Sequence, residues 1–384
     1  MKETKFKNTE IGEIPKDWEV TSIGKVCNVR RGVRVTKEQL TDEGRYPVYQ
    51  NTNYPMGYFD NYNADANTPF VIVGGSAGQI GLSKERYWAA DDCAYFEKSN
   101  TLNKVFLYYE LTHRQFEIKK FVRTASVPRL DRKVIEDFVL PLPSLHEQHR
   151  IASALTSIDN LISSLGKLIE KKKNIKQGAM QQLLTGKTRL KGFNEPWMEK
   201  KLGDIGSLAM CKRIFQEETS EKGDVPFYKI GTFGQQADAY ITKGKYEQFK
   251  QMYRFPQKGD VLISAAGTIG RMVIYNGEPA YFQDSNIVWL AHNGKYITNN
   301  FLFYIYQRTD WNTEDTTIAR LYNNNFNNTC IYFPSSITEQ QAIANILSKM
   351  DNEITALETK KAKYEAIKQG MMQQLLTGKI RLIS

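Results

Sequence analysis

A segment of fifteen residues occurs twice in this chain, and its two copies lie half a chain length apart. Residues 176–190 read KQGAMQQLLTGKTRL and residues 368–382 read KQGMMQQLLTGKIRL, so thirteen of the fifteen positions are identical at an offset of 192 in a chain of 384 residues. The match continues upstream at the same offset, where Glu147 corresponds to Glu339. A repeat of this length indicates a tandem duplication, so we expect two copies of one structural unit.

Length and composition limit the class of protein. A chain of 384 residues can bury two hydrophobic cores, about one in each half. No apolar run approaches the roughly 20 residues of a membrane-spanning helix, and the charged first thirty residues lack the apolar centre of a signal peptide. The four cysteines form no CxxC pair and no disulfide pattern. We therefore expect a reduced, soluble, cytoplasmic protein without a membrane partner.

The charge of the chain is compatible with nucleic-acid binding. Its net charge is +10 and its pI is about 9.1, and 12% of its residues are aromatic, including 21 tyrosines. Lysine and arginine neutralise phosphates, and Tyr, Asn and Gln can stack on bases or bind their edges. Charge alone fits a basic protein without an acidic partner equally well.

Each copy of the repeat contains a stretch with the spacing of a coiled-coil helix. A Ser-x-x-Glu capping box opens each stretch at Ser144 and Ser336, and a Thr-Gly-Lys closes each at Gly186 and Gly378. Between them, apolar residues recur in alternating steps of four and three, which is typical of the seam between paired helices. In the first stretch these residues are Ile151, Leu155, Ile158, Ile162, Leu165 and Ile169. A helix of this length extends roughly 60 Å.

The short linker after the first helix restricts the arrangement of the two halves. Residues 187–196 span at most about 35 Å, so the second globule must begin near the far end of the first helix. We expect the second helix to return antiparallel, giving a dumbbell with a pseudo-two-fold axis. The predicted fold class is α+β, with two mixed α/β domains joined by a two-helix coiled coil. The predicted parts are domain 1 (residues 1–143), the first helix (144–186), the linker and domain 2 (187–335), and the second helix with its tail (336–384).

The globules show short strands bounded by Gly, Asn and Pro, such as Pro69–Val73 and Val261–Ser264. Aromatic-rich helices are predicted at Val105–Phe116 and Asn300–Gln307. The second globule has about ten additional residues around Tyr240–Pro256. Such insertions usually lie in surface loops, which often form binding surfaces.

Two glycine-rich segments align between the halves. Gly78-Gln-Ile-Gly81 matches Gly267-Thr-Ile-Gly270 at an offset of 189. Before these segments, the first half reads Val71-Ile-Val-Gly-Gly-Ser76 where the second reads Val261-Leu-Ile-Ser264. We therefore expect the first loop to have a different shape from the second.

At this point the chain resembles the specificity (S) subunits of type I restriction–modification enzymes. The resemblance covers nearly the whole chain and is carried by the order of several short motifs. These are Ile14-Pro-Lys-Asp-Trp18, Gly259-Asp-Val-Leu-Ile-Ser264, Gly267-Thr-Ile-Gly270, and a Pro-x-x-x-Glu-Gln-x-x-Ile entry to each long helix. It implies that each globule is a target recognition domain for one half of a split, asymmetric DNA site. It also implies that the paired helices act as a ruler and dock two methyltransferase (M) subunits.

The same resemblance implies a non-catalytic reader without a cofactor of its own. S-adenosylmethionine would be held by the partner methyltransferase, and ATP and Mg by the motor subunit, with two restriction/motor (R) subunits as further partners. The sequence agrees, because it contains no Pro-Pro dipeptide of the kind found in amino methyltransferases. Gly186-Lys187-Thr188 lacks the upstream glycine of a phosphate-binding loop, since Gln181 occupies that position. His146 and His149 have no third partner at metal-ligand spacing, so no metal site is expected.

The candidate DNA contacts are loop cations for phosphates and side chains suited to bidentate base contacts. In the first globule they are Arg30, Arg31, Arg34, Lys37, Tyr49, Gln50, Asn51, Asn53, Gly78, Arg123 and Arg129. In the second they are Lys212, Arg213, Lys229, Thr232, Lys243, Lys245, Gly267, Thr268, Arg271 and Arg320. Arg129 and Arg320 align through an Arg-Leu dipeptide, and for this pair a DNA contact and a structural salt bridge fit equally.

Candidate partner contacts lie near the ends of the helices. A glycine inside each helix, although unfavourable there, suggests a close approach by another backbone. The predicted contacts are Gly178, Gln181, Gln182, Gly370, Gln373 and Gln374.

Two functions of other classes remain as alternatives. A stand-alone DNA-binding regulator would need no methyltransferase and would favour a symmetric operator, against which the unlike globules argue. A helical scaffold protein would use its helices for protein contacts alone. An enzyme with its own active site is disfavoured by the missing motifs.

Overall fold

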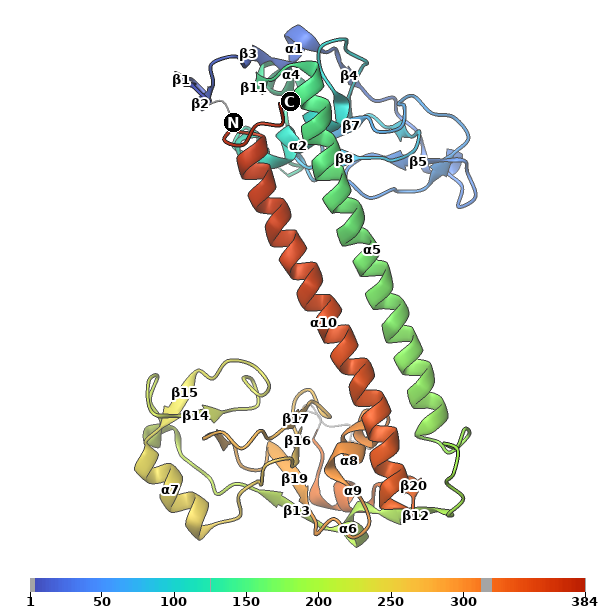
Figure 1. The fold of residues 1–384 in the computed structure, drawn as a ribbon, viewed down its shortest axis with the longest axis vertical. Coiled ribbons are helices and arrows are strands. Elements are labelled where there is room, and N and C mark those ends of the chain that lie inside the picture. Colours follow the sequence, from blue (N-terminus) through green and yellow to red (C-terminus); the bar gives the residue numbers. More distant parts are fainter. Residues whose placement is uncertain (1–3, 125, 312–319, 384) are drawn as a thin grey trace. The chain divides into compact units, whose positions relative to one another are not determined.

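The structure of the chain is a computed structural model in which helices and strands alternate along most of the sequence (Figure 1). It describes residues 4–124, 126–311 and 320–383. Contacts divide the chain into two compact units, the first made of Met1–Lys167 with Glu358–Ser384 and the second of Leu168–Leu357. Each unit contains one globule and half of each long helix. The predicted boundaries at residues 143 and 335 separate globules from helices, whereas these units are divided within the helices. The predicted boundaries therefore stay predictions.

The first globule contains a four-stranded sheet and a three-stranded sheet. Its strands are β1 (Phe6–Thr9), β2 (Gly12–Pro15), β3 (Glu19–Ser22), β4 (Val29–Arg31), β5 (Tyr46–Tyr49), β6 (Tyr58–Phe59), β7 (Pro69–Ile72), β8 (Ile80–Leu82), β9 (Trp88–Ala89), β10 (Cys93–Phe96) and β11 (Val139–Leu142). Its helices are α1 (Ile23–Val26), η1 (Lys37–Gln39), α2 (Lys104–His113), α3 (Gln115–Lys119) and α4 (Arg132–Asp137). The larger sheet has the antiparallel order β4-β10-β7-β8, and the smaller has the order β6-β5-β9. Buried Trp18, Phe106 and Leu140 belong to one core.

The second globule repeats this topology except for the β1–β2 hairpin, which has no counterpart among its described residues. Its strands are β12 (Trp197–Lys201), β13 (Ser207–Met210), β14 (Val225–Tyr228), β15 (Ala239–Ile241), β16 (Val261–Ser264), β17 (Met272–Ile274), β18 (Tyr281–Phe282), β19 (Ile287–Ala291) and β20 (Cys330–Pro334). Its helices are α6 (Leu202–Ile205), η2 (Gln216–Glu218), α7 (Lys243–Met252), α8 (Asn299–Tyr306) and α9 (Asn323–Asn328). The sheets have the orders β13-β19-β16-β17 and β15-β14-β18. The predicted tandem repeat of mixed α/β domains is therefore confirmed.

Two local differences from the sequence predictions have clear causes. The additional residues of the second half form α7, which lies within the predicted insertion and buries Tyr246 in its globule. The helix predicted at Val105–Phe116 is wrong in its extent, because α2 ends at His113 and α3 begins at Gln115. Between them Arg114 leaves the helical conformation, with φ −103° and ψ 18°, and binds Glu117 and the carbonyl of Val139.

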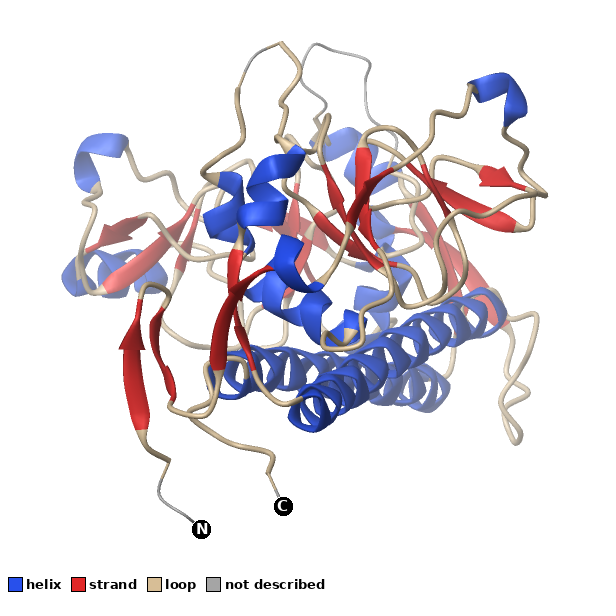
Figure 2. Ribbon diagram, turned by 90° about the horizontal axis from the view of Figure 1, so that it is seen from above, coloured by secondary structure: helices blue, strands red, loops and turns tan. Residues whose placement is uncertain are grey.

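The strands are confined to the globules, and the two long elements are helical throughout (Figure 2). They are α5 (Leu145–Leu183) and α10 (Ile337–Leu375), each of 39 residues. In the first unit Asp159 of α5 pairs with Lys368 of α10 at 2.7 Å, and in the second Lys176 pairs with Asp351 at 2.5 Å. In these contacts a higher residue number in α5 goes with a lower residue number in α10. The predicted antiparallel pairing of the two helices is therefore confirmed.

The same three-residue contact joins each globule to both helices. A tyrosine of the globule donates its hydroxyl hydrogen to an aspartate of one helix, at 2.7 Å in the first unit and 2.8 Å in the second. A lysine of the other helix pairs with that aspartate and lies over the tyrosine ring. The residues are Tyr109, Asp159 and Lys368 in the first unit and Tyr304, Asp351 and Lys176 in the second. The contact fixes the register of the helices against each globule.

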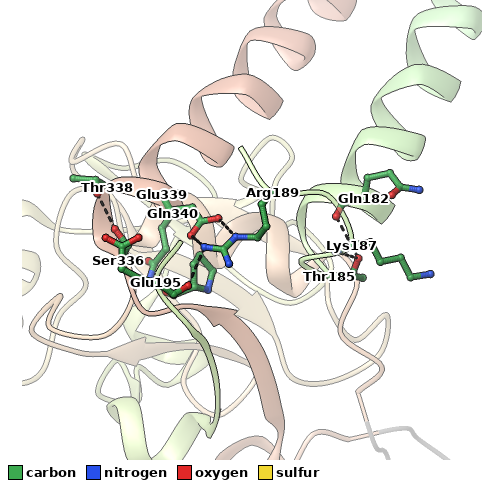
Figure 3. Close-up of polar contacts among 10 residues, drawn as sticks. Gln182, Thr185, Lys187, Arg189, Glu195, Ser336, Thr338, Glu339 and Gln340 are labelled. Carbon is green, nitrogen blue, oxygen red and sulfur yellow. Dashed lines mark hydrogen bonds and ion pairs between the residues drawn. The ribbon is translucent and has the colours of Figure 1, made fainter. Parts of the chain in front are cut away.

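Residues that follow each long helix contact the start of the other one. In the second unit, Arg189 donates from Nε and Nη2 to the two carboxylate oxygens of Glu339, each at 2.7 Å, and Nη2 also donates to the carbonyl of Glu195 (Figure 3). In the first unit, Arg381 binds the carboxylate of Glu147 in the same way, at 2.7 and 2.8 Å. We call each arrangement a tail contact. Each copy of the repeat thus supplies an arginine to the helix start of the other copy.

The tail contacts correct one half of the predicted capping boxes. The amide of Glu147 donates to Ser144 Oγ at 3.3 Å, as the capping box predicts. Its carboxylate does not bind the backbone at the helix start, because it accepts from Trp18 Nε1 and Arg381 instead. Glu147 and Glu339 are 1% and 0% exposed, and a charge buried this deeply requires a partner of opposite sign.

The glutamine that follows each of these glutamates connects the helix to its globule. Its side-chain amide donates to two carbonyls, and its oxygen accepts from the amide at the start of α2 or α8. The contacts are Gln148 with Thr101, Asn103 and Pro143 and, in the second unit, Gln340 with Tyr296, Thr298 and Pro334. The repeated Glu-Gln dipeptide therefore has two separate structural roles.

No other part of the described chain approaches the helical glycines closely, so their predicted contact with a partner stays a prediction. A Cβ added at Gly178 or Gly370 would meet no atom of the described residues within 4 Å. Both positions thus lie beside open space. No helix among the described residues has the length and apolar character needed to cross a membrane.

Candidate nucleic-acid interface

In the first unit, the ends of β4, β5 and β7 meet the segment before β10. Because β10 is antiparallel to both β4 and β7, its first residues lie beside their last ones. Arg31 donates from Nε to the carbonyl of Asp91 at 3.1 Å, and Gln50 Nε2 lies 3.4 Å from the Asp91 carboxylate. Asn51 accepts at its carbonyl from the amide of Ser76 at 2.9 Å. The structure thus brings together three of the predicted contacts, Arg31, Gln50 and Asn51.

Two arginines after α3 join the same place. Arg129 forms isolated antiparallel bridges with Gly74 and with Arg123. Its guanidinium donates from Nη1 to Asp92 Oδ1 at 2.5 Å, while the Arg129 side chain remains 56% exposed. We call residues 31, 50, 51, 74–78, 91, 92, 123 and 129 the first edge.

A buried thiol supports the first edge from the interior. Cys93 Sγ lies 3.3 Å from the carbonyl of Tyr49 and 3.2 Å from that of Gln50. Burial raises the pKa of the Cys93 thiol, which favours its neutral form. Its role is to hold the backbone at the end of β5.

Several predicted residues of the first globule lie outside the first edge. Tyr49 is buried, with its ring 4.6 Å from that of Phe70, because both faces of β5 are covered. Its predicted contact with DNA is therefore corrected to a role in the core. Arg30 points away from Arg31 along the strand and pairs with Glu97 at 2.6 Å, which lowers the pKa of that carboxyl. The remaining predicted residues, exposed on the segments after β4 and β5, are Arg34, Lys37 and Asn53.

The second unit has the equivalent edge, formed before β19. Arg213 pairs with Asp284 at 2.8 Å, and the amide of Ile230, next to Lys229, donates to Gln283 at 2.9 Å. Arg320 forms an isolated bridge with Ala266 and donates from Nη2 to Asn286 at 3.3 Å. We call residues 213, 229–233, 266–271, 283–286 and 320 the second edge. It includes the predicted Arg213, Lys229, Thr232, Gly267, Thr268, Arg271 and Arg320, with Arg271 Nη1 donating to the carbonyl of Phe233 at 3.1 Å.

Three predicted lysines have their contacts outside the second edge. Lys243 and Lys245 lie on α7, where Lys245 pairs with Glu218 and the amide of Lys243 donates to Asp224. Lys212 lies over the ring of Tyr253, 5.3 Å from its centroid. These side chains instead accompany the insertion that distinguishes the second globule.

The glycine loops of the two edges have the same shape, which corrects two expectations. Gly78 donates its amide hydrogen to the last residue of β7, Ile72, at 2.8 Å, and Gly270 does so to the last residue of β16, Ser264, at 3.1 Å. Gly78 therefore corresponds to Gly270 and not to Gly267. The φ values agree, at +82° and +65° for the first glycine of each loop and +80° and +84° for the second. The loops are Gly75-Ser-Ala-Gly78 and Gly267-Thr-Ile-Gly270, which require glycine at both positive φ values.

Sequence reasoning missed the residues that hold the edges together. Asp92 and Asn286 each precede a central strand and bind an arginine, yet neither belongs to a recognisable motif. The sequence could have indicated them only by position, because each lies just before the strand that pairs with β7 or β16. Among the described residues, no group of three or more His, Cys, Asp or Glu is arranged to hold a metal ion.

Comparison with known proteins gives matches over almost the whole chain. The model of the type I restriction modification DNA specificity domain matches residues 15–177 and again 194–369. The chain is similar to a putative type I restriction enzyme specificity subunit of Haemophilus influenzae, with 34% identity over 375 residues and 94% of each chain covered. It is 26% identical over 419 residues to the type I restriction enzyme MjaVIII specificity subunit of Methanocaldococcus jannaschii, covering 99% of this chain and 97% of the other.

A solved structure shares the fold. The crystal structure of the S subunit of a type I restriction–modification system from M. genitalium superposes with a TM-score of 0.70. The sequences are 20% identical, and the match covers 97% of this chain and 98% of the other. At this identity the likeness concerns the fold alone.

Proposed function

Because the chain belongs to the type I restriction–modification DNA specificity family, we propose that it recognises an asymmetric, bipartite DNA site with one globule on each half. The observation that carries this proposal is the pair of equivalent edges with different side chains. Where the first edge presents Gln50 and Asn51, the second presents Lys229 and Ile230 after the equivalent strand. Unlike side chains on a common frame suit two different half-sites, since base edges are distinguished by donors and acceptors.

The paired helices are the proposed platform for two methyltransferase subunits and, through them, for two restriction/motor subunits. Each helix has 39 residues, which corresponds to about 58 Å and would set the distance between the two half-sites. Exposed apolar side chains on the helices support a protein contact, including Leu168 at 39% and Ile175 at 47%. Open space beside Gly178 and Gly370 is compatible with a close approach by a partner backbone.

This chain would contribute recognition, and its partners would contribute the chemistry. S-adenosylmethionine is expected on the methyltransferase, with ATP and Mg on the motor subunit, all in the cytoplasm. The exposed cations of both edges are suited to phosphate contacts, and the neighbouring amides to base contacts.

Methylation mapping tests the proposal directly. The chain is expressed with its methyltransferase, and the modified positions are determined by long-read sequencing. We expect a two-part motif with unlike halves. Exchanging residues 197–330 for those of a relative should alter one half only, and a matched exchange in the first globule should alter the other.

The outcomes separate this function from its rivals. If exchanging one globule changed both halves of the methylated motif, the proposal that each globule recognises one half-site would be wrong. A symmetric motif bound without a methyltransferase would favour a regulator. A complex without salt-sensitive DNA affinity would favour a helical scaffold.

A further inference from the structure

Both edges hold an arginine at the same position relative to the glycine loop. Arg129 bridges Gly74, the residue before the first loop, and Arg320 bridges Ala266, the residue before the second. In each unit the leucine that follows the arginine donates its amide hydrogen, at 2.9 Å, to the residue that precedes the bridged one. The backbone therefore places both arginines identically, although the surrounding sequences have diverged.

Each arginine is held by the residue that precedes the neighbouring central strand. Arg129 Nη1 donates to Asp92 Oδ1 at 2.5 Å, and Arg320 Nη2 donates to Asn286 Oδ1 at 3.3 Å. A Cβ added at Gly74 would lie 2.3 Å from Asp92 Oδ1 and 2.7 Å from Arg129 Nη1. Glycine thus leaves room for a close ion pair in the first unit, whereas Ala266 already has a Cβ and the contact there is longer.

A hydroxyl side chain follows the first glycine of each loop. It belongs to Ser76 in the first unit and to Thr268 in the second, after glycines of similar positive φ. Among the residues that the structure describes, neither hydroxyl makes a hydrogen bond, so each retains a donor. An arginine and a hydroxyl on a glycine-rich loop are a donor set suited to a phosphate.

Features shared by the two edges should bind what the two half-sites share. On the proposed function the halves differ in their bases and have the sugar–phosphate backbone in common. We propose that Arg129 with Ser76, and Arg320 with Thr268, form the same DNA phosphate site in the two domains. Asp92 and Asn286 position the arginines, while the unlike residues at the ends of β5 and β14 distinguish bases. This inference rests on the proposed function and adds the assignment of roles.

The two phosphate sites differ in charge. In the first unit the arginine is paired with a carboxylate, whereas in the second it is held by a neutral amide. Asp92 is 17% exposed, so its negative charge lies close enough to the surface to oppose a phosphate. The first site should therefore bind its phosphate more weakly than the second. Exchanging the two residues tests this difference from both directions.

The experiment measures DNA affinity of the complete complex with its methyltransferase as a function of salt. The probes are a duplex with the site found by methylation mapping and duplexes with either half scrambled. Arg129→Ala should weaken binding to all duplexes by a similar factor, roughly fivefold to tenfold, and lower the salt slope by about 1. Arg320→Ala should act in the same way, and the double variant should combine the two losses because the sites are independent.

Matched variants make the result specific. Arg86→Ala removes another exposed arginine of the first unit, paired with Asp65 at 3.8 Å, and should leave affinity unchanged. Asp92→Asn should tighten binding and steepen the salt dependence, and Asn286→Asp should do the opposite. A merely structural role for Asp92 would change the melting temperature and not the salt slope. Arg129→Lys keeps the charge and should restore the slope if Arg129→Ala does not fold.

Three results would overturn the inference. The first is a relaxed base position in the methylation motif of Arg129→Ala, which would make Arg129 a base contact. The second is a DNA affinity and a salt slope that are unchanged in Arg129→Ala and Arg320→Ala. The third is weaker DNA binding by Asp92→Asn than by the wild type. A wild-type complex that binds every duplex equally would instead refute the proposed function, so the two failures are distinguishable.

Discussion

Removal of the Arg381 side chain should destabilise the first unit and leave the second intact. Arg381 binds Glu147 through two hydrogen bonds and also binds Asp17 near the N-terminus. These contacts raise the pKa of the Arg381 guanidinium, so the residue is a cation at every accessible pH. The substitution Arg381→Ala would leave the buried Glu147 carboxylate without its cation.

The magnitude follows from the burial of the pair. Side chains of Arg381 and Glu147 are 8% and 1% exposed. Removing one partner of a buried ion pair costs about 3–5 kcal/mol. Glu147 keeps the hydrogen bond from Trp18 Nε1 at 3.0 Å, which places the loss near the lower limit. The contact with Asp17, which is 65% exposed, should add little. We expect a loss of about 3 kcal/mol, or on the order of 100-fold in the opening equilibrium.

Hydrogen exchange with peptide resolution is the appropriate assay, because a chain with two compact units does not give one two-state transition. Peptides around Trp18 and the start of α5 should exchange faster in Arg381→Ala, while those around Trp197 keep their rates. Lys379→Ala changes an exposed side chain of the same tail and should have no effect. Arg189→Ala is the equivalent change in the second unit and should reverse the pattern. An effect below about 1 kcal/mol, or equal effects in both units, would refute the reasoning.

Three further changes test other parts of the structure. Burial raises the pKa of Glu110 to about 8 from 4.5, so the native state retains its proton while the unfolded chain releases it, and stability falls as pH rises through that window. Glu110→Gln should remove up to roughly 1.4 kcal/mol of this loss per pH unit. If the protection of α2 peptides from hydrogen exchange changes equally in both proteins between pH 5 and about pH 8, the prediction is wrong. Asn51→Ala should cost roughly 1–3 kcal/mol of discrimination at one base pair, and an unrelaxed methylation motif would show that Asn51 reads no base. Ile175→Glu should prevent assembly with the methyltransferase while both globules stay folded, and an unchanged mass of the complex would count against the helical platform.

The long helices could be predicted because their pattern is local and periodic. The four-three spacing identified the buried positions of the helix, of which Leu165 and Ile169 lie outside the globule cores and Leu155 belongs to the core of the first globule. The antiparallel pairing followed from chain length and the short linker. Neither inference needed a contact between residues distant in sequence.

The tail contacts could not be predicted, since they join residues far apart in the chain. A Ser-x-x-Glu motif indicates a capping box, and nothing near Glu147 shows that an arginine 234 residues away competes for its carboxylate. The identical repeat segment contained both arginines, but identity alone did not assign them a partner. Within that segment, the contacts described account for Arg189 and Arg381 and for Lys176 and Lys368.

The candidate site was predicted in part. Arg31, Gln50 and Asn51 lie together because antiparallel neighbours bring strand ends together, and their contact with DNA stays a prediction. The predicted DNA contact at Tyr49 was wrong because β5 is covered on both faces, so that consecutive side chains of this strand are buried. The glycine alignment failed because Gly75, Gly78 and Gly81 are evenly spaced, so a shift of three residues also matched.

The tail contact of the first unit has a consequence for synthesis of the chain. Gly378, at φ +69°, lies so close to Pro15 that an added Cβ would be 2.3 Å from Pro15 Cγ, and Leu375 and Leu376 belong to the same core as Trp18. A ribosome makes residues 14–18 long before it reaches residues 375–381, so the domain that emerges first is completed last. A chain that stops before residue 375 would therefore lack part of the core of the first unit and retain the residues of the second.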